Sequence, residues 1–471
     1  MPDKDIGLCR VTAVLLYNLV LQFISNGFNA IVIPTELSIW KPSQTALYSG
    51  LMIGMGSTIL ATSPIVGHYV DAFGRRPVII LGAFIVSCGE ALLIMGVYTR
   101  NASSDFGFTL YFSGYLVTQV GTVLMSTCFN ALVADLSSDY PHKAGKISAI
   151  YGLYGLTGAT FSYVAAGFIF PVSNSNHLFY WFAAAVTTFA NIALLLSVPP
   201  SPTKDKPEQA SESGLRRCGV VCSLWLCSDD YLPWRRVVIS RALYFFGGGV
   251  FGALILFFIY DCTDSADPES TMGITAVISL TGSLIAAYPA GVLADRFGSV
   301  ICVFLAGILM ALVFTAIPLL YNINTILFFI PFYGMAQQVY NVADLSMITA
   351  ALPDPEKRAR DMGGWVAVDS IGGALGSTLA GLIITLVGKS DKTVSENHDD
   401  KFFDDTDDDA VASRIAYTRH GYAMVFWPAA GALLLGSLIL WPIRHRLEHK
   451  KDAQDDEDKK TSPLITDTDF Y

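Results

Sequence analysis

The segment GHYVDAFGRRP, from Gly67 to Pro77, returns in weaker form as GVLADRFG, from Gly291 to Gly298. Each copy places an Asp four residues after its first Gly, and a second Gly three residues after that Asp. Both copies lie between two long apolar segments. A motif that recurs after about half the chain indicates two similar halves. In a membrane-embedded chain, this organisation is typical of a transporter whose substrate site lies between the halves.

The composition places the chain in a bilayer. Of its 471 residues, 52% are hydrophobic and only 15% are charged, and the mean hydropathy is +0.48, which is too apolar for a soluble two-domain protein. An apolar stretch of about 20 residues crosses the hydrocarbon core. The sequence therefore predicts an all-α membrane protein with twelve transmembrane helices, at residues 10–33, 46–70, 77–98, 107–134, 145–170, 178–198, 237–260, 272–294, 300–321, 325–350, 361–387 and 420–443.

Twelve helices divide into two pseudo-symmetric bundles of six. We expect an N-terminal bundle at residues 1–198, a cytoplasmic linker at 199–236, a C-terminal bundle at 237–443 and a cytoplasmic tail at 444–471. An interfacial helix is expected in the linker around GVVCSLWLC, Gly219 to Cys227. Most of the 30 Lys and Arg residues fall on the side that carries both termini, which predicts that both termini are cytoplasmic.

Two short motifs bear on the outer face and on localisation. Asn101 begins a glycosylation sequon in a predicted outer loop. The plasma membrane is the leading localisation. An endolysosomal or vacuolar membrane is the alternative, because Pro463-Leu464-Ile465 loosely resembles a sorting signal.

The repeated motif has a mechanical interpretation as a latch between helices. Gly67 removes a side chain where two helices approach closely, Asp71 faces the positive N-terminus of a neighbouring helix, and Arg75 holds the loop on the cytoplasmic side. In the second copy, Ser299 replaces the first residue of the Arg pair, so a weaker latch is expected. The predicted gating residues are Gly67, Asp71, Gly74, Arg75, Arg76, Asp135, Gly291, Asp295 and Arg296.

Polar side chains recur at helical spacing on three predicted helices. An amide that faces lipid lacks partners, so these stripes are expected to face a cavity or other helices. The stripes are Asn18, Gln22, Asn26 and Asn29 in the first helix, Gln119, Thr122, Ser126 and Asn130 in the fourth, and Gln337, Asn341 and Asp344 in the tenth. We assign substrate binding to Asn18, Gln22, Asn26, Gln119, Ser126, Asn130, Gln337 and Asn341.

Three acids lie well within predicted helices, away from their ends: Asp344, Asp369 and Glu90. A buried carboxyl without a partner favours its protonated form, which a proton carrier needs. All three are candidates for proton coupling, and Asp344 leads because it shares a stripe with two amides. For Glu90 a structural hydrogen bond is the alternative, and for Asp369 a helix contact. Arg241 is expected to extend to the cytoplasmic interface.

The spacing G-x-x-x-D-x-x-G-R-R resembles the loop between helices two and three of the major facilitator superfamily, and the resemblance covers nearly the whole chain. It implies that helices one, four, seven and ten line a central cavity, and three of these carry the polar stripes. The segment ALVADL, Ala131 to Leu136, resembles the sucrose transporters and related glycoside-cation symporters. Those relatives carry an Arg at the place of Asn130 and an Asp at the place of Gln119, so neither their coupling mechanism nor sucrose carries over.

These observations predict a secondary active transporter that moves a small polar solute by alternating access, and the buried acids predict coupling to protons. A sugar is the leading solute because amides both donate to and accept from hydroxyls. The alternatives are a proton-coupled transporter or exporter of an organic cation, drug-like compound or metal complex, and a non-transporting receptor on the same fold. An enzyme is not expected, nor a metal site, cofactor or nucleic-acid partner. The expected partners are the solute, protons and lipid, and the chain is expected to be a monomer.

Overall fold

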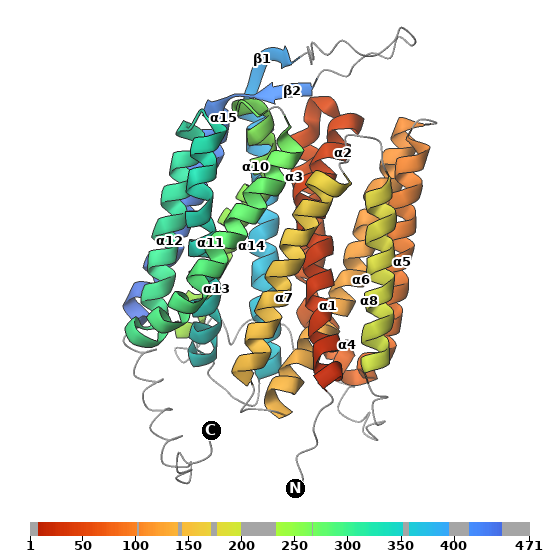
Figure 1. Cartoon of the computed structure of the whole chain (residues 1–471), viewed down its shortest axis with the longest axis vertical. Coiled ribbons are helices and arrows are strands. Elements are labelled where there is room, and N and C mark those ends of the chain that lie inside the picture. Colours follow the sequence, from red (N-terminus) through yellow and green to blue (C-terminus); the bar gives the residue numbers. More distant parts are fainter. Residues whose placement is uncertain are drawn as a thin grey trace.

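A computed structural model describes residues 8–100, 103–139, 144–170, 177–198, 232–265, 267–351, 358–394 and 414–444. Within them the chain forms twelve membrane-length helical spans, which confirms the predicted all-α fold (Figure 1). The interfacial helix expected in the linker, the sequon at Asn101 and the tail all lie outside the described residues.

The N-terminal bundle contains the first six spans. In the first span a short π-helix separates two α-helices, and in the second a turn of two residues does so. These spans are α1 Leu8–Gly27 with the π-helix η1 Phe28–Val32 and α2 Ile33–Trp40; η2 Pro42–Gln44 with α3 Thr45–Leu60 and α4 Ser63–Phe73; α5 Arg75–Thr99; α6 Ser104–Asp139; α7 Ala144–Val164 with the π-helix η4 Ala165–Ile169; and α8 Leu178–Ser197.

The C-terminal bundle contains the other six spans. They are α10 Leu232–Cys262, α11 Pro268–Phe297, α12 Ser299–Ala316 with η7 Ile317–Leu319, α13 Ile323–Ala351, α14 Arg358–Val387, and α15 Arg419–Leu440 with η9 Trp441–Ile443. Among the described residues, ten spans are apolar enough by composition to cross a membrane. The other two are α7, which is rich in Gly and Tyr, and α13, which carries the amides of the third stripe.

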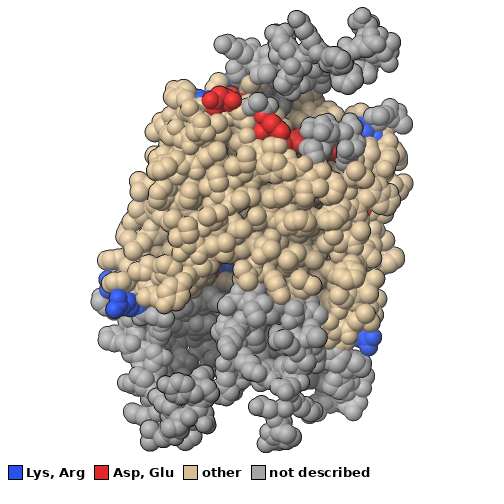
Figure 2. All heavy atoms as spheres, viewed as in Figure 1, with Lys and Arg blue, Asp and Glu red and all other residues tan. Residues whose placement is uncertain are grey.

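The helices run side by side along the long axis, so that α1 begins and α15 ends at the same end of the molecule (Figure 1). The opposite end carries two antiparallel strands, β1 Lys389–Val394 and β2 Arg414–Tyr417, which lie between the last two spans in the sequence. On the face in Figure 2, charged side chains lie near the two ends, and the broad band between them is almost free of them. Such a band fits the hydrocarbon core of a bilayer.

The second Gly of each motif copy, and not the first, is required by the backbone. Gly74 and Gly298 have φ angles of 81° and 86° and separate α4 from α5 and α11 from α12. That region is costly for residues with a Cβ. By contrast, a Cβ on Gly67 would come no closer than 3.8 Å to Thr127, and one on Gly291 would have no neighbour within 4 Å. The predicted close approach at the first Gly is therefore wrong for this conformation.

The two bundles pack against each other through small residues near the strand-bearing end. Gly50 of α3 lies against Ser377 and Gly381 of α14, where the backbones leave no room for a Cβ. On the other side, the Ser270 hydroxyl of α11 donates to the Gly167 carbonyl of η4 at 3.2 Å. Small residues allow such close helix crossings in membranes.

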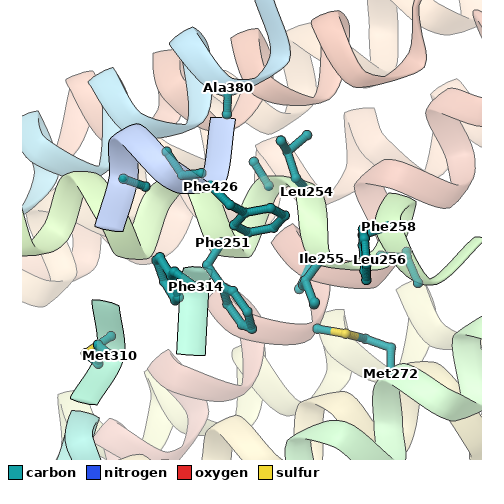
Figure 3. Packing of buried hydrophobic residues seen from close by; sticks show 14 of the residues in the cluster. Phe251, Leu254, Ile255, Leu256, Phe258, Met272, Met310, Phe314, Ala380 and Phe426 are labelled. Atoms are coloured by element: carbon teal, nitrogen blue, oxygen red, sulfur yellow. The ribbon is translucent and has the colours of Figure 1, made fainter. Parts of the chain in front are cut away.

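The largest apolar core, which extends into both bundles, contains in the C-terminal bundle a cluster of aromatic rings from three helices. Phe251, Phe314 and Phe426, from α10, α12 and α15, point toward one another in Figure 3. The rings of Phe251 and Phe314 stack with centroids 5.2 Å apart and an interplanar angle of 9°. This packing holds α10 in a fixed position, which matters because α10 also carries the buried Arg of the candidate site.

Candidate functional site

A buried ion-pair network joins three helices of the C-terminal bundle. Arg241 of α10 is only 4% exposed and forms ion pairs with Asp344 of α13 and Asp369 of α14. Its Nε and Nη2 groups donate to the two carboxylate oxygens of Asp369, and Nη1 pairs with Oδ2 of Asp344. We call Arg241, Asp344 and Asp369 the triad. The expectation that Arg241 reaches the interface is wrong, because its side chain turns inward onto these acids.

Aromatic rings enclose the Arg241 guanidinium. Its central carbon lies 3.6 Å from the ring centroid of Trp365 and 4.7 Å from that of Phe245. Tyr244 stacks on Tyr340 with an interplanar angle of 5°, and both tyrosines lie close enough to Arg241 for electrostatic interaction. A guanidinium held over aromatic faces gains cation–π stabilisation, which grows when water is excluded.

The triad has unequal charges. One Arg and two Asp give a net charge of −1 when all three are ionised. A buried charge that lacks a counter-charge is costly, especially inside a membrane. One further positive charge would bring the triad to neutrality.

Three polar atoms around the triad lack partners among the described residues. They are the buried Oδ1 of Asp344, the hydroxyl of Tyr244 and the indole N–H of Trp365. Buried polar groups in native proteins are nearly always satisfied, so a cluster of exceptions calls for a missing partner. One acceptor and two donors suit a small polar ligand or ordered water.

The site extends to the N-terminal bundle. Tyr151 of α7 lies close enough to Asp369 for electrostatic interaction, and its backbone carbonyl accepts from the Asn18 amide of α1 at 2.8 Å. Tyr163, also on α7, lies close enough to Tyr333 of α13 for electrostatic interaction. The triad thus faces the seam between the bundles, where alternating access changes the contacts.

The amides of α1, with Asn29 of η1, are largely engaged within the protein. Asn26 donates to both the side chain and the backbone carbonyl of Gln22, each at 2.9 Å. Asn29 accepts from the Tyr115 hydroxyl at 3.2 Å, and Gln119 lies beside the same hydroxyl. The stripes of the first and fourth predicted helices therefore do meet, but they meet through Tyr115, and part of their hydrogen-bonding capacity is already used.

The remaining predicted residues are more scattered. Ser126 donates to the Val123 carbonyl at 3.3 Å, Asn130 and Gln337 are half-buried, and Asn341 is exposed. The assignment of substrate binding to these residues stays a prediction. Glu90 lies in the N-terminal bundle, on a different set of helices from the triad.

The gating side chains are only partly visible. The side chains of Asp71, Asp135 and Asp295 lie outside the described ones. Arg75 and Arg76 are half-buried at the start of α5, and Arg296 is exposed at the end of α11. The latch stays a prediction at these positions.

Comparison with known proteins identifies the fold. The sequence pattern of the Major Facilitator Superfamily matches residues 11–266 and 237–470. Multidrug resistance protein 1 of Bacillus subtilis (strain 168) is 26% identical over 306 residues, which are 63% of this chain and 68% of that protein. Solute carrier family 2, facilitated glucose transporter member 12 of Mus musculus is 24% identical over 293 residues, 57% of this chain and 44% of that protein.

Solved structures agree on the architecture. The human organic anion transporter MFSD10 (TETRAN) superposes with a TM-score of 0.63 and 17% identity, covering 92% of this chain and 99% of that one. A POT family transporter in complex with 5-aminolevulinic acid gives a TM-score of 0.68 at 13% identity, covering 93% and 96%. At such identities the likeness concerns the fold.

Proposed function

Because this chain belongs to the Major Facilitator Superfamily, we propose that it is a secondary transporter that exchanges protons for a small organic cation at the triad. The narrower resemblance to sucrose transporters stays a prediction, and the relatives found are of other kinds. The observation that carries the proposal is a buried site with a net charge of −1 and an unpartnered Asp344 oxygen, enclosed by aromatic rings.

The chemistry of the site favours a cation over the neutral sugar expected from the sequence. The sugar prediction depended on amides that bind hydroxyls, but Asn18, Asn26 and Asn29 already bond within the protein. The triad, in contrast, has a net charge of −1 when its three side chains are ionised, and no further ion pair joins it among the described residues. The names of the Bacillus subtilis relatives fit a drug-like solute, whereas the name of the mouse relative fits a sugar.

Exchange follows from the charge of the triad. A proton on a carboxyl, or a monovalent cation beside it, brings the site to neutrality. Once one of them is bound, the site no longer attracts the other electrostatically. Mutually exclusive binding of one proton or one cation gives exchange in a ratio of one to one. Each state has different contacts, as a transporter that couples two gradients requires.

The test uses purified protein in proteoliposomes with a pH-sensitive dye inside. We expect ethidium, but not glucose or sucrose, to drive proton movement, and we expect Asp344→Asn to abolish it. The matched control is Asp105→Asn, because Asp105 is 89% exposed and pairs with Lys41 far from the triad in the fold. Sugar uptake that depends on Gln22 or Asn130 and is not inhibited by ethidium would instead support a sugar transporter.

A further inference from the structure

A groove opens on the side of the N-terminal bundle, between α5 and α8. It has a volume of about 470 Å³, within the range of small-molecule sites. Its lining residues are Ser87, Glu90, Ala91, Ile94, Met95, Tyr98, Thr99, Trp181, Ala184 and Thr188. Met95, Tyr98 and Trp181 are each more than half exposed, so the rim faces outward where the bilayer contacts the bundle.

One carboxyl lies in this otherwise apolar groove. Glu90 is 9% exposed, and its Oε2 is buried without a hydrogen-bond partner among the described residues. Thr187 lies within hydrogen-bonding reach of the carboxyl, and Tyr17 of α1 is near enough to interact electrostatically. The described residues that line the groove include no basic one. Among them the carboxyl therefore has none of the counter-charge that buried acids usually have.

The aromatic pair at one end limits how the groove can be entered. The Trp181 indole donates to the Tyr98 hydroxyl at 3.3 Å, and the Tyr98 ring lies 4.6 Å from the ring of His177. This contact spans α5 and α8 at the end where α5 finishes. Glu90 lies nine residues before that end, about 14 Å deeper at the rise of an α-helix. The open route to Glu90 is sideways, from the hydrocarbon layer.

We propose that this groove binds a membrane-dissolved amphiphilic amine, whose ammonium group pairs with the Glu90 carboxylate. The apolar body then lies along Ile94, Met95 and the Trp181 ring, which supply contact area and a face for cation–π attraction. Bound protons alone neutralise the carboxyl but leave the groove without an occupant. A lipid head group stays at the membrane surface, above the depth of Glu90.

The test measures binding of dansylcadaverine to full-length protein in an uncharged maltoside detergent, by dansyl fluorescence. Its N-acetyl derivative is the neutral control, since it keeps the apolar body and lacks the amine. We expect Glu90→Gln to weaken the amine about tenfold or more, as charged hydrogen bonds do, and to leave the neutral derivative unchanged. An unchanged unfolding midpoint shows that this isosteric variant folds.

Two further variants separate this groove from other sites. Ala91→Trp fills the groove and is expected to weaken both ligands. Ala193→Trp fills a second groove of about 280 Å³ between α1 and α8, whose lining carries no charge, and is expected to change neither. Asp344→Asn, which removes the cation site proposed at the triad, is expected to leave the part of the amine binding that depends on Glu90 intact. Equal amine binding by Glu90→Gln and the unaltered protein, or loss only in Asp344→Asn, overturns the proposal.

Discussion

Removal of Arg241 should destabilise the protein in a way that depends on the two acids it neutralises. Arg241→Gln leaves two buried carboxylates without their shared counter-charge. Loss of one partner from a buried ion pair costs about 3–5 kcal/mol. For 471 residues, an unfolding entropy of about 2.1 cal/mol/K per residue converts this into a fall of about 3–5 °C in the unfolding midpoint.

The assay is thermal unfolding followed by tryptophan fluorescence, since Trp365 packs on Arg241 and Trp234 is buried. At pH 7.5 the full loss is expected. At pH 5.5 the fall in the unfolding midpoint should be smaller, because more protons are available to neutralise the two carboxyls that have lost Arg241 as their counter-charge. Arg296→Gln, which removes an exposed Arg from α11, is the matched control and should change little.

The decisive arm restores neutrality without restoring Arg241. The triple variant Arg241→Gln, Asp344→Asn and Asp369→Asn has no charge left in the triad, and neutral replacement of a buried ionic group is often tolerated. We expect it to unfold above Arg241→Gln at pH 7.5. If it unfolds no higher, or if Arg241→Gln matches the unaltered protein at both pH values, then the charge argument is wrong.

Further predictions concern the backbone and the surface. Gly74→Ala should add about 1–2 kcal/mol of backbone strain and so lower the unfolding midpoint, whereas Gly67→Ala, with room for a Cβ, should leave the midpoint unchanged; equal midpoints for the two variants would show that residue 74 does not require a positive φ. Gly381→Val should leave the folded yield of each bundle intact but reduce transport, because it separates α14 from α3; uptake assays beside size-exclusion profiles test this, and normal uptake would count against the crossing. Partial burial and the Arg100 charge lower the pKa of His177, so the folded state favours neutral imidazole and its contribution to stability is lost as pH falls. His177→Gln should therefore lose less stability than the unaltered protein between pH 7.5 and pH 5.5, and an identical loss would contradict this.

The helical framework could be predicted from the sequence because its signals are local and long. Most spans are apolar runs of membrane length, and the structure places a helix at every predicted position. The repeated motif also located the equivalent turns, which both contain a positive-φ glycine. The role of each Gly in the motif could not be predicted. Spacing alone does not tell which of Gly67 and Gly74 satisfies a backbone requirement and which has free space around it.

The triad could not be predicted because it depends on helix boundaries and on contacts distant in sequence. The seventh span was expected to begin at residue 237, which places Arg241 one turn inside the helix and within reach of the interface. In fact α10 begins at Leu232, so Arg241 lies nine residues, or about 14 Å, along it. A usable signal was present, since Asp344 and Asp369 were two intramembrane acids without a basic partner, and Arg241 was the nearest candidate in the same bundle.

The position of the triad suggests how a change of charge is connected to movement of the bundles. Asp369 lies on α14, and α14 also makes the glycine crossing with α3 through Gly381, twelve residues or about 18 Å farther along the same helix. Tyr151 approaches Asp369 from the opposite bundle. A proton or cation that weakens the ion pair between Arg241 and Asp369 therefore acts on α14, the same helix that packs against the other bundle. Coupling needs only that the two packings of this helix differ in their affinity for the added charge, and no separate relay between the site and the interface is required.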